Sequence, residues 1–193
     1  GIRLYDGAAV GPYIRNVVIS NNVLAVSNVA TIFFARGILI ESVQEAVDLE
    51  RQFVISGNNV WSFSEYGIMV SAAGAAVTKN VAISCNVLRS EIGCSAAVYL
   101  SEVSFFAVTG NNIDLPLAAQ SNHGIFVSYG GAGGNGTIGG NMVMVNLPAA
   151  TFYCIRGVNS DYIATVGNTA VSGNAQHVSV AGANSVTASN SVV

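Results

Sequence analysis

The sequence predicts an all-β protein, a single-stranded parallel β-helix that forms a solenoid of about seven to eight coils over residues 1–193. Three observations predict it. Two short apolar phrases alternate along almost the whole chain, an asparagine recurs at the end of one of them, and no long segment between them has a helical period.

The first phrase is an apolar, β-branched run that ends in Ser, Thr or Gly and is followed by an asparagine. Its clear copies occupy residues 16–23, 52–60, 80–87 and 105–113, and weaker ones lie at 137–142, 163–168 and 186–190. Runs of four to six such residues, bounded by Gly, Asn or Ser, are typical of strands. We therefore expect one strand of each coil here.

The second phrase lies between successive copies of the first and usually begins with glycine. Its copies occupy residues 1–4, 37–40, 67–70, 97–100 and 124–127, with a weak copy at 153–155. Stacking coils about 4.8 Å apart would give every strand a parallel neighbour and bury a continuous core. The alternation of two strand types in a fixed order therefore predicts the solenoid.

The recurring asparagine predicts a ladder of stacked side-chain amides at one bend of every coil. Such amides bond to those above and below, and asparagine tolerates the left-handed backbone that a bend can require. Successive anchors are 22 to 37 residues apart, and the predicted ladder residues are Asn22, Asn59, Asn86, Asn112, Asn141 and Asn168.

The composition excludes several classes of function. Hydrophobic residues make up 51% of the chain and charged residues 9%, yet the longest apolar runs are strand-sized, far short of the roughly 20 residues of a membrane-spanning helix. A net charge of −3 with seven scattered Lys and Arg lacks the basic stripe that nucleic acid requires. We expect neither membrane insertion nor nucleic-acid binding.

No metal or cofactor is expected. Cys85, Cys94 and Cys154 have no zinc-ligand spacing, and we predict small buried side chains, with a Cys85–Cys94 disulfide as the alternative. The glycine-rich residues 130–136 lack the Gly-Lys-Ser/Thr of a phosphate loop. The chain forms one domain, and because solenoids need polar terminal caps that both ends lack, we expect a segment of a longer protein.

Aligning the second phrase predicts columns of residues along the solenoid. The column before the strand holds Arg36, Tyr66, Ala96, His123 and Phe152, and the column after it holds Tyr5, Glu41, Ser71, Ser101 and Ser128. Aromatic rings beside hydrogen-bonding groups suit a sugar surface. The predicted substrate-binding residues are Arg36, Tyr66, Asn122, His123 and Tyr129. The alternative is that these are ordinary exposed residues flanking strands.

Glu41, Glu65 and Glu102 are the candidate catalytic residues. Glycoside hydrolysis usually uses two carboxyl groups about 5 to 9.5 Å apart. Glu41 and Glu65 are predicted in adjacent coils, and Glu41 and Glu102 two coils apart, so the coil spacing allows either pair. The alternative, a surface without catalysis, stays open.

The alternating phrases resemble those of the pectate-lyase-like right-handed parallel β-helix superfamily over nearly the whole chain. Within it, the low charge and irregular coils look most like the β-helix of bacteriophage tailspikes and tail fibres. The resemblance implies a right-handed solenoid that forms a homotrimer on the virion tail or outside the cell and binds, or cleaves as a depolymerase, bacterial surface polysaccharide.

Two other functions remain open, a secreted polysaccharide lyase or glycoside hydrolase and a structural stalk or adhesin. Residues 122–124 are similar to the Gly-His-Gly element of polygalacturonases but lack its first glycine, and the other elements of that family are missing. The resemblance therefore does not extend to that activity.

Overall fold

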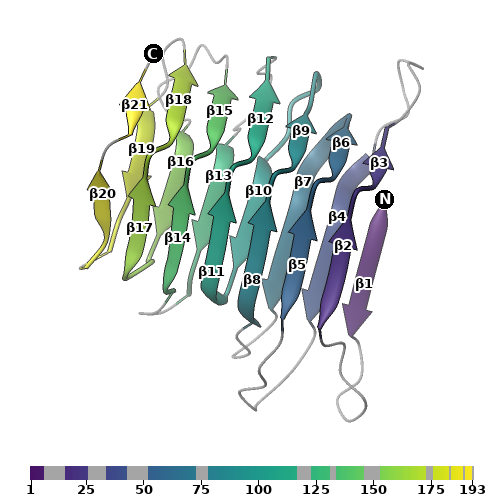
Figure 1. The fold of residues 1–193 in the computed structure, drawn as a ribbon, viewed down its shortest axis with the longest axis horizontal. Coiled ribbons are helices and arrows are strands. Elements are labelled where there is room, and N and C mark those ends of the chain that lie inside the picture. Colours follow the sequence, from purple (N-terminus) through teal and green to yellow (C-terminus); the bar gives the residue numbers. More distant parts are fainter. Residues whose placement is uncertain are drawn as a thin grey trace.

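The computed structural model confirms an all-β, parallel solenoid (Figure 1). It describes residues 1–6, 16–25, 34–42, 52–72, 78–116, 123–130, 134–145, 153–172, 176–182, 184–188 and 190–192. Over these ranges every regular element is a strand. No helix long and apolar enough to cross a membrane is found in them.

Three seven-stranded parallel sheets, here called A, B and C, form the walls of the solenoid. Sheet A contains, in order, β1 (Ile2–Asp6), β4 (Phe34–Ser42), β7 (Phe63–Ala72), β10 (Ala96–Ser101), β13 (His123–Ser128), β16 (Tyr153–Val158) and β19 (Gln176–Val180). Sheet B contains β2 (Val17–Ser20), β5 (Phe53–Ser56), β8 (Thr78–Ser84), β11 (Val103–Thr109), β14 (Gly136–Gly139), β17 (Ile163–Val166) and β20 (Val186–Ala188). Sheet C contains β3 (Val23–Leu24), β6 (Asn59–Trp61), β9 (Val87–Arg89), β12 (Asn112–Leu115), β15 (Met142–Val145), β18 (Thr169–Ser172) and β21 (Ser191–Val192).

Each coil contributes one strand to each sheet, which gives seven coils stacked along the long axis from the purple to the yellow end of Figure 1. Sheets A and B are built from the two predicted phrases. Sheet C was not predicted as a separate sheet, because its strands are only two to four residues long and were included in the tail of the first phrase.

The core lies between the three sheets, and in it aliphatic residues of successive coils stack on one another. Inward residues of sheet A fall in register along the axis, so that Ile38, Ile68, Val98, Ile125 and Ile155 form one column. Each of these side chains is fully buried. Since successive side chains of a strand point to opposite faces, the residue that follows each of these five in its own strand lies on the outer surface.

The asparagine ladder exists, but two of its predicted members are wrong. At each of the six steps between coils, the backbone N–H and side-chain amide of one asparagine both donate to Oδ1 of the asparagine in the next coil, at 2.9–3.1 Å. The members are Asn22, Asn58, Asn86, Asn111, Asn141, Asn168 and Asn190. Asn59 and Asn112 instead begin β6 and β12.

The reason is the backbone conformation just before the ladder. In six coils the residue preceding the ladder asparagine has a positive φ, between 56° and 65°: these residues are Asn21, Gly57, Cys85, Gly110, Gly140 and Gly167. The left-handed residue is therefore the neighbour of the ladder asparagine. In a Gly-Asn-Asn segment the glycine turns the chain, so the first asparagine enters the ladder.

The alternative of a Cys85–Cys94 disulfide is wrong, because both residues are thiols, and the predicted burial is wrong for Cys85. Cys94 and Cys154 are buried, as predicted, and burial raises the pKa of each thiol to about 12. Cys85 is exposed at the turn before the ladder.

Candidate functional site

The outer face of sheet A brings together aromatic residues from two columns. Strand pairing confirms the predicted column Arg36, Tyr66, Ala96 and His123, and its next member is Tyr153 where the sequence predicted Phe152. A second outward column, three residues further along each strand, contains Leu39, Met69, Tyr99, Phe126 and Arg156.

Rings from these columns form a continuous series, here called the aromatic strip, of Tyr66, Tyr99, Phe126, His123 and Tyr153. Tyr66 stacks on Tyr99 with ring centroids 4.9 Å apart and an interplanar angle of 15°. Tyr99 contacts Phe126 at 5.3 Å, and His123 contacts Phe126 at 5.0 Å and Tyr153 at 5.9 Å. The strip runs over four neighbouring strands, β7 to β16, or about 14 Å at the spacing of parallel strands.

His123 is the buried member of the strip, with 5% of its surface exposed. Its Nδ1 accepts a hydrogen bond from the backbone N–H of Tyr153 at 3.3 Å, and its Nε2 lies 3.3 Å from Nη1 of Arg156. Burial, and then the positive charge of Arg156, lower the pKa of His123 to about 4. The imidazole is therefore neutral at physiological pH.

Arg156 lies over two rings of the strip. Its Cζ is 5.5 Å from the centroid of Phe126 and 5.3 Å from that of Tyr153. These are cation–π distances, and they hold the planar guanidinium against the sheet. The strip thus carries a fixed positive charge at the β13–β16 end.

At the opposite end of the strip, Arg36 and Glu65 form an ion pair beside Tyr66, with Nε 2.8 Å from Oε2. Burial, followed by the neighbouring Tyr99, raises the pKa of Tyr66, so its phenol stays protonated and can donate a hydrogen bond.

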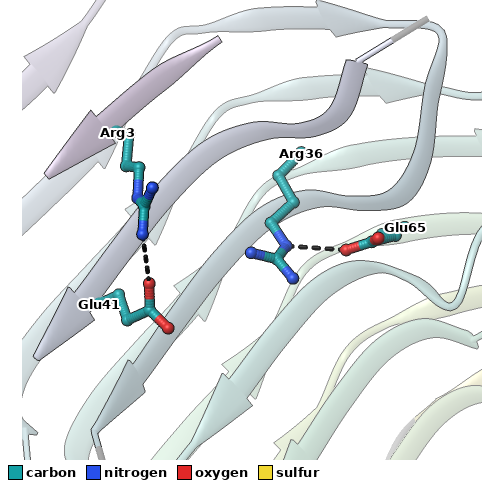
Figure 2. A network of polar contacts seen from close by, with 4 residues as sticks. All are labelled: Arg3, Arg36, Glu41 and Glu65. Atoms are coloured by element: carbon teal, nitrogen blue, oxygen red, sulfur yellow. Dashed lines mark hydrogen bonds and ion pairs between the residues drawn. The ribbon is translucent and has the colours of Figure 1, made fainter. Parts of the chain in front are cut away.

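Glu41 and Glu65 are not brought together as an acid/base pair. Strand pairing places Tyr66, the neighbour of Glu65, opposite Arg36. Glu41 lies opposite Ser71, five residues further along the strands, so about 16 Å separates the level of Arg36 and Tyr66 from that of Glu41. That exceeds the carboxyl separations of glycosidases. Figure 2 shows that each carboxylate has its own arginine partner, Arg3 for Glu41 at 3.2 Å and Arg36 for Glu65.

Glu41 and Glu102 do not converge either. The partner of Glu41, Arg3, lies in the coil before it, whereas Oε1 of Glu102 accepts a hydrogen bond from Gly130 N–H in the coil after it. The contacts of Glu41 and of Glu102 therefore hold the two carboxylates in opposite directions along the solenoid axis. Tyr129 lies close to this turn and its hydroxyl is 3.3 Å from Ser104 Oγ.

Asn122, a predicted substrate-binding residue, lies outside the residues that the structure describes. Among the residues that the structure describes, no group of three or more His, Cys, Asp or Glu side chains is arranged to hold a metal ion.

Sequence reasoning missed Tyr99, Phe126, Tyr153 and Arg156. It considered the residues that flank the strands of sheet A and passed over the outward position in the middle of each strand. Part of the signal was available, because alternation from an inward residue such as Ile125 places its neighbour Phe126 outward. The alternation does not extend to the first column, since two consecutive residues, Gly124 and Ile125, both point inward.

Comparisons with protein-family models, with curated proteins and with solved structures find no match to this chain.

Proposed function

We propose that this β-helix recognises bacterial surface polysaccharide and that the aromatic strip of sheet A is its binding surface. The setting is the one that the sequence resemblance implies, a virion tail or an extracellular location. The observation that carries the proposal is the series of ring contacts from Tyr66 to Tyr153 over four adjacent coils.

The surface has the two features that a sugar chain requires. Aromatic rings present flat apolar faces on which the C–H face of a pyranose can stack. Polar groups border them: the Arg36–Glu65 ion pair lies near the start of β4 and β7. The hydroxyl column of Ser71, Ser101 and Ser128 lies at the other end of the strands. A chain lying along the solenoid axis would meet rings and hydroxyls in successive coils.

Binding is favoured over cleavage. The carboxylates proposed as catalytic are separated along the strand or held toward different coils, and each already has a partner. A depolymerase would need a pair of carboxyl groups within glycosidase distance or another acid/base set.

Tyr99→Ala tests the strip. Because Tyr99 contacts the rings of both Tyr66 and Phe126, its loss removes the middle of the strip, and we expect about tenfold weaker binding, equivalent to about 1.4 kcal/mol. The measurement is the affinity for purified bacterial capsular and O-chain polysaccharides, found on an array and then determined by calorimetry.

The matched control is Tyr5→Ala, which removes a half-exposed tyrosine of the same sheet in the first coil, away from the strip. Equal affinities for Tyr99→Ala and the parent chain would contradict the proposed surface. A parent chain that binds no polysaccharide would favour a structural stalk.

We further propose that three copies of this chain associate through the outer face of sheet B. One outward column of that sheet contains only small or β-branched uncharged residues: Val18, Val54, Ala82, Ala107, Thr137, Ala164 and Val186. Val18 and Val186 are 65% and 58% exposed. An uncharged, apolar column of this kind suits a position facing a threefold axis, where the other two copies would cover it.

The expected mass from light scattering is that of three chains, and Val54→Lys should shift it to one chain by placing a charge in the interface. Val87→Lys is the control, because Val87 is similarly exposed (40% against 37% for Val54) but lies on sheet C. A monomeric parent chain, or dissociation by Val87→Lys alone, would contradict the proposed interface.

A further inference from the structure

The imidazole of His123 faces more hydrogen-bond donors than it can satisfy. A neutral imidazole has one N–H and one acceptor nitrogen. Two donors point at it, the backbone N–H of Tyr153 at Nδ1 and the guanidinium of Arg156 at Nε2, both at 3.3 Å. If Nδ1 accepts from Tyr153, Nε2 carries the proton, and its N–H then faces an N–H of Arg156 with no acceptor between them. If Nε2 accepts from Arg156, Nδ1 meets Tyr153 in the same way.

The guanidinium of Arg156 adds to this excess of donors. It has five N–H groups and no acceptor. Among the described residues Arg3, Arg36 and Arg89 each form an ion pair with a carboxylate, and none is formed by Arg156. Its register neighbours in the adjacent coils are Phe126 and Ser179, which carry no charge.

These donors lie on the surface where the polysaccharide is proposed to bind. Phe126 and Tyr153 belong to the aromatic strip, and the guanidinium of Arg156 lies over both of their rings. A sugar stacked there would bring its substituents next to the guanidinium. An anionic oxygen satisfies such donors best, because charge-assisted hydrogen bonds are about twice as strong as neutral ones and a guanidinium can bind a carboxylate or phosphate with two N–H groups.

We propose that the Arg156–His123 cluster binds an acidic substituent of the polysaccharide, a carboxylate or a phosphate, so that the ligand of the aromatic strip is an anionic polymer. This inference rests on the proposed function, since it assumes that a polysaccharide lies on the strip. The protein as a whole carries a net charge of −3, so the preference for an anion is a local property of this cluster.

The experiment compares matched polymers on the complete chain. The probes are xanthan, alginate and hyaluronan, each beside its carboxyl-reduced form, a ribitol teichoic acid as the phosphate polymer, and dextran and levan as neutral polymers. We expect at least one acidic polymer to bind tenfold or more tightly than its reduced form, or the teichoic acid to bind tenfold or more tightly than the neutral polymers. The first result identifies a carboxylate ligand and the second a phosphate ligand.

Arg156→Met should abolish this discrimination, because methionine keeps an apolar stem between the rings and removes the charge. Arg3→Met is the control, since Arg3 is the arginine of the same column in the first coil. Tyr99→Ala should weaken the acidic and reduced forms by the same factor, and equal urea midpoints would show that the variants are folded.

Equal binding of acidic and reduced or neutral polymers, or unchanged discrimination in Arg156→Met, would overturn the acidic-ligand inference and leave the proposed function standing. Binding to none of these polymers and to no polysaccharide of the array would overturn the proposed function itself.

Discussion

Replacing Asn111 with alanine is expected to destabilise the protein by about 3 kcal/mol, whereas replacing the next residue, Asn112, should change stability by less than about 0.5 kcal/mol. Asn111 is 1% exposed and lies in the middle of the ladder. Asn112 begins β12 with its side chain exposed to solvent. The two variants change the same chemical group at adjacent positions.

The size of the effect follows from the partners that Asn111 would leave behind. Its Oδ1 accepts from both the backbone N–H and the side-chain amide of Asn86, and its own amide donates to Asn141 Oδ1 and to the carbonyl of Ile83. In Asn111→Ala the N–H of Asn86, a residue with no exposed surface, loses its acceptor. A buried donor without a partner costs about 1–3 kcal/mol, and the lost amide bonds add to it.

The measurement is the midpoint of urea unfolding for the parent chain and the two variants. A shift for Asn112→Ala as large as that for Asn111→Ala would contradict the ladder assignment. It would support the ladder positions that the sequence alone predicted.

This pair of residues also shows how far the sequence could specify the fold. The repeat of Asn after a β-branched run located every bend correctly, because the stacked amides require an asparagine there. It did not distinguish the two members of Asn58-Asn59 or Asn111-Asn112, because the choice depends on which residue adopts the left-handed conformation. Gly57 and Gly110 adopt it, with φ of 65° and 63°.

The candidate site was predicted in part for a similar reason. The small residue that opens the second phrase, a glycine in β4, β7 and β13 and Ala97 in β10, fixed the register of these strands, so the column of Arg36, Tyr66 and His123 was correct. In β16 that glycine is replaced by Cys154, which lies between the paired residues Tyr153 and Ile155, and the prediction slipped by one residue to Phe152.

The carboxylates could not be paired from the sequence. Coil spacing limits how far apart two residues of one column lie, but Glu41 and Glu65 belong to opposite ends of their strands. The direction of each carboxylate is then set by an ion pair with an arginine, Arg3 for Glu41 and Arg36 for Glu65, and the predicted columns did not show either pairing.

Acidification should destabilise the protein through His123. Burial and the adjacent Arg156 lower the pKa of His123 from its usual 6.5 to about 4 in the folded chain. Between these values the unfolded chain binds the proton and the folded chain does not, so stability rises with pH. The contribution of His123 is complete above about pH 6.5 and is lost as the pH falls toward 4, a change on the order of 2 kcal/mol.

His123→Gln isolates this effect, because glutamine keeps a donor and an acceptor but does not titrate. Carboxylates that titrate over the same range contribute equally to both proteins, so the difference between their unfolding free energies at pH 7 and pH 4 reports His123 alone. We expect the parent chain to lose about 2 kcal/mol more than His123→Gln over that interval. Parallel pH profiles would mean that the imidazole is protonated in the folded chain as readily as in the unfolded one, and that the positive charge of Arg156 is not held against it.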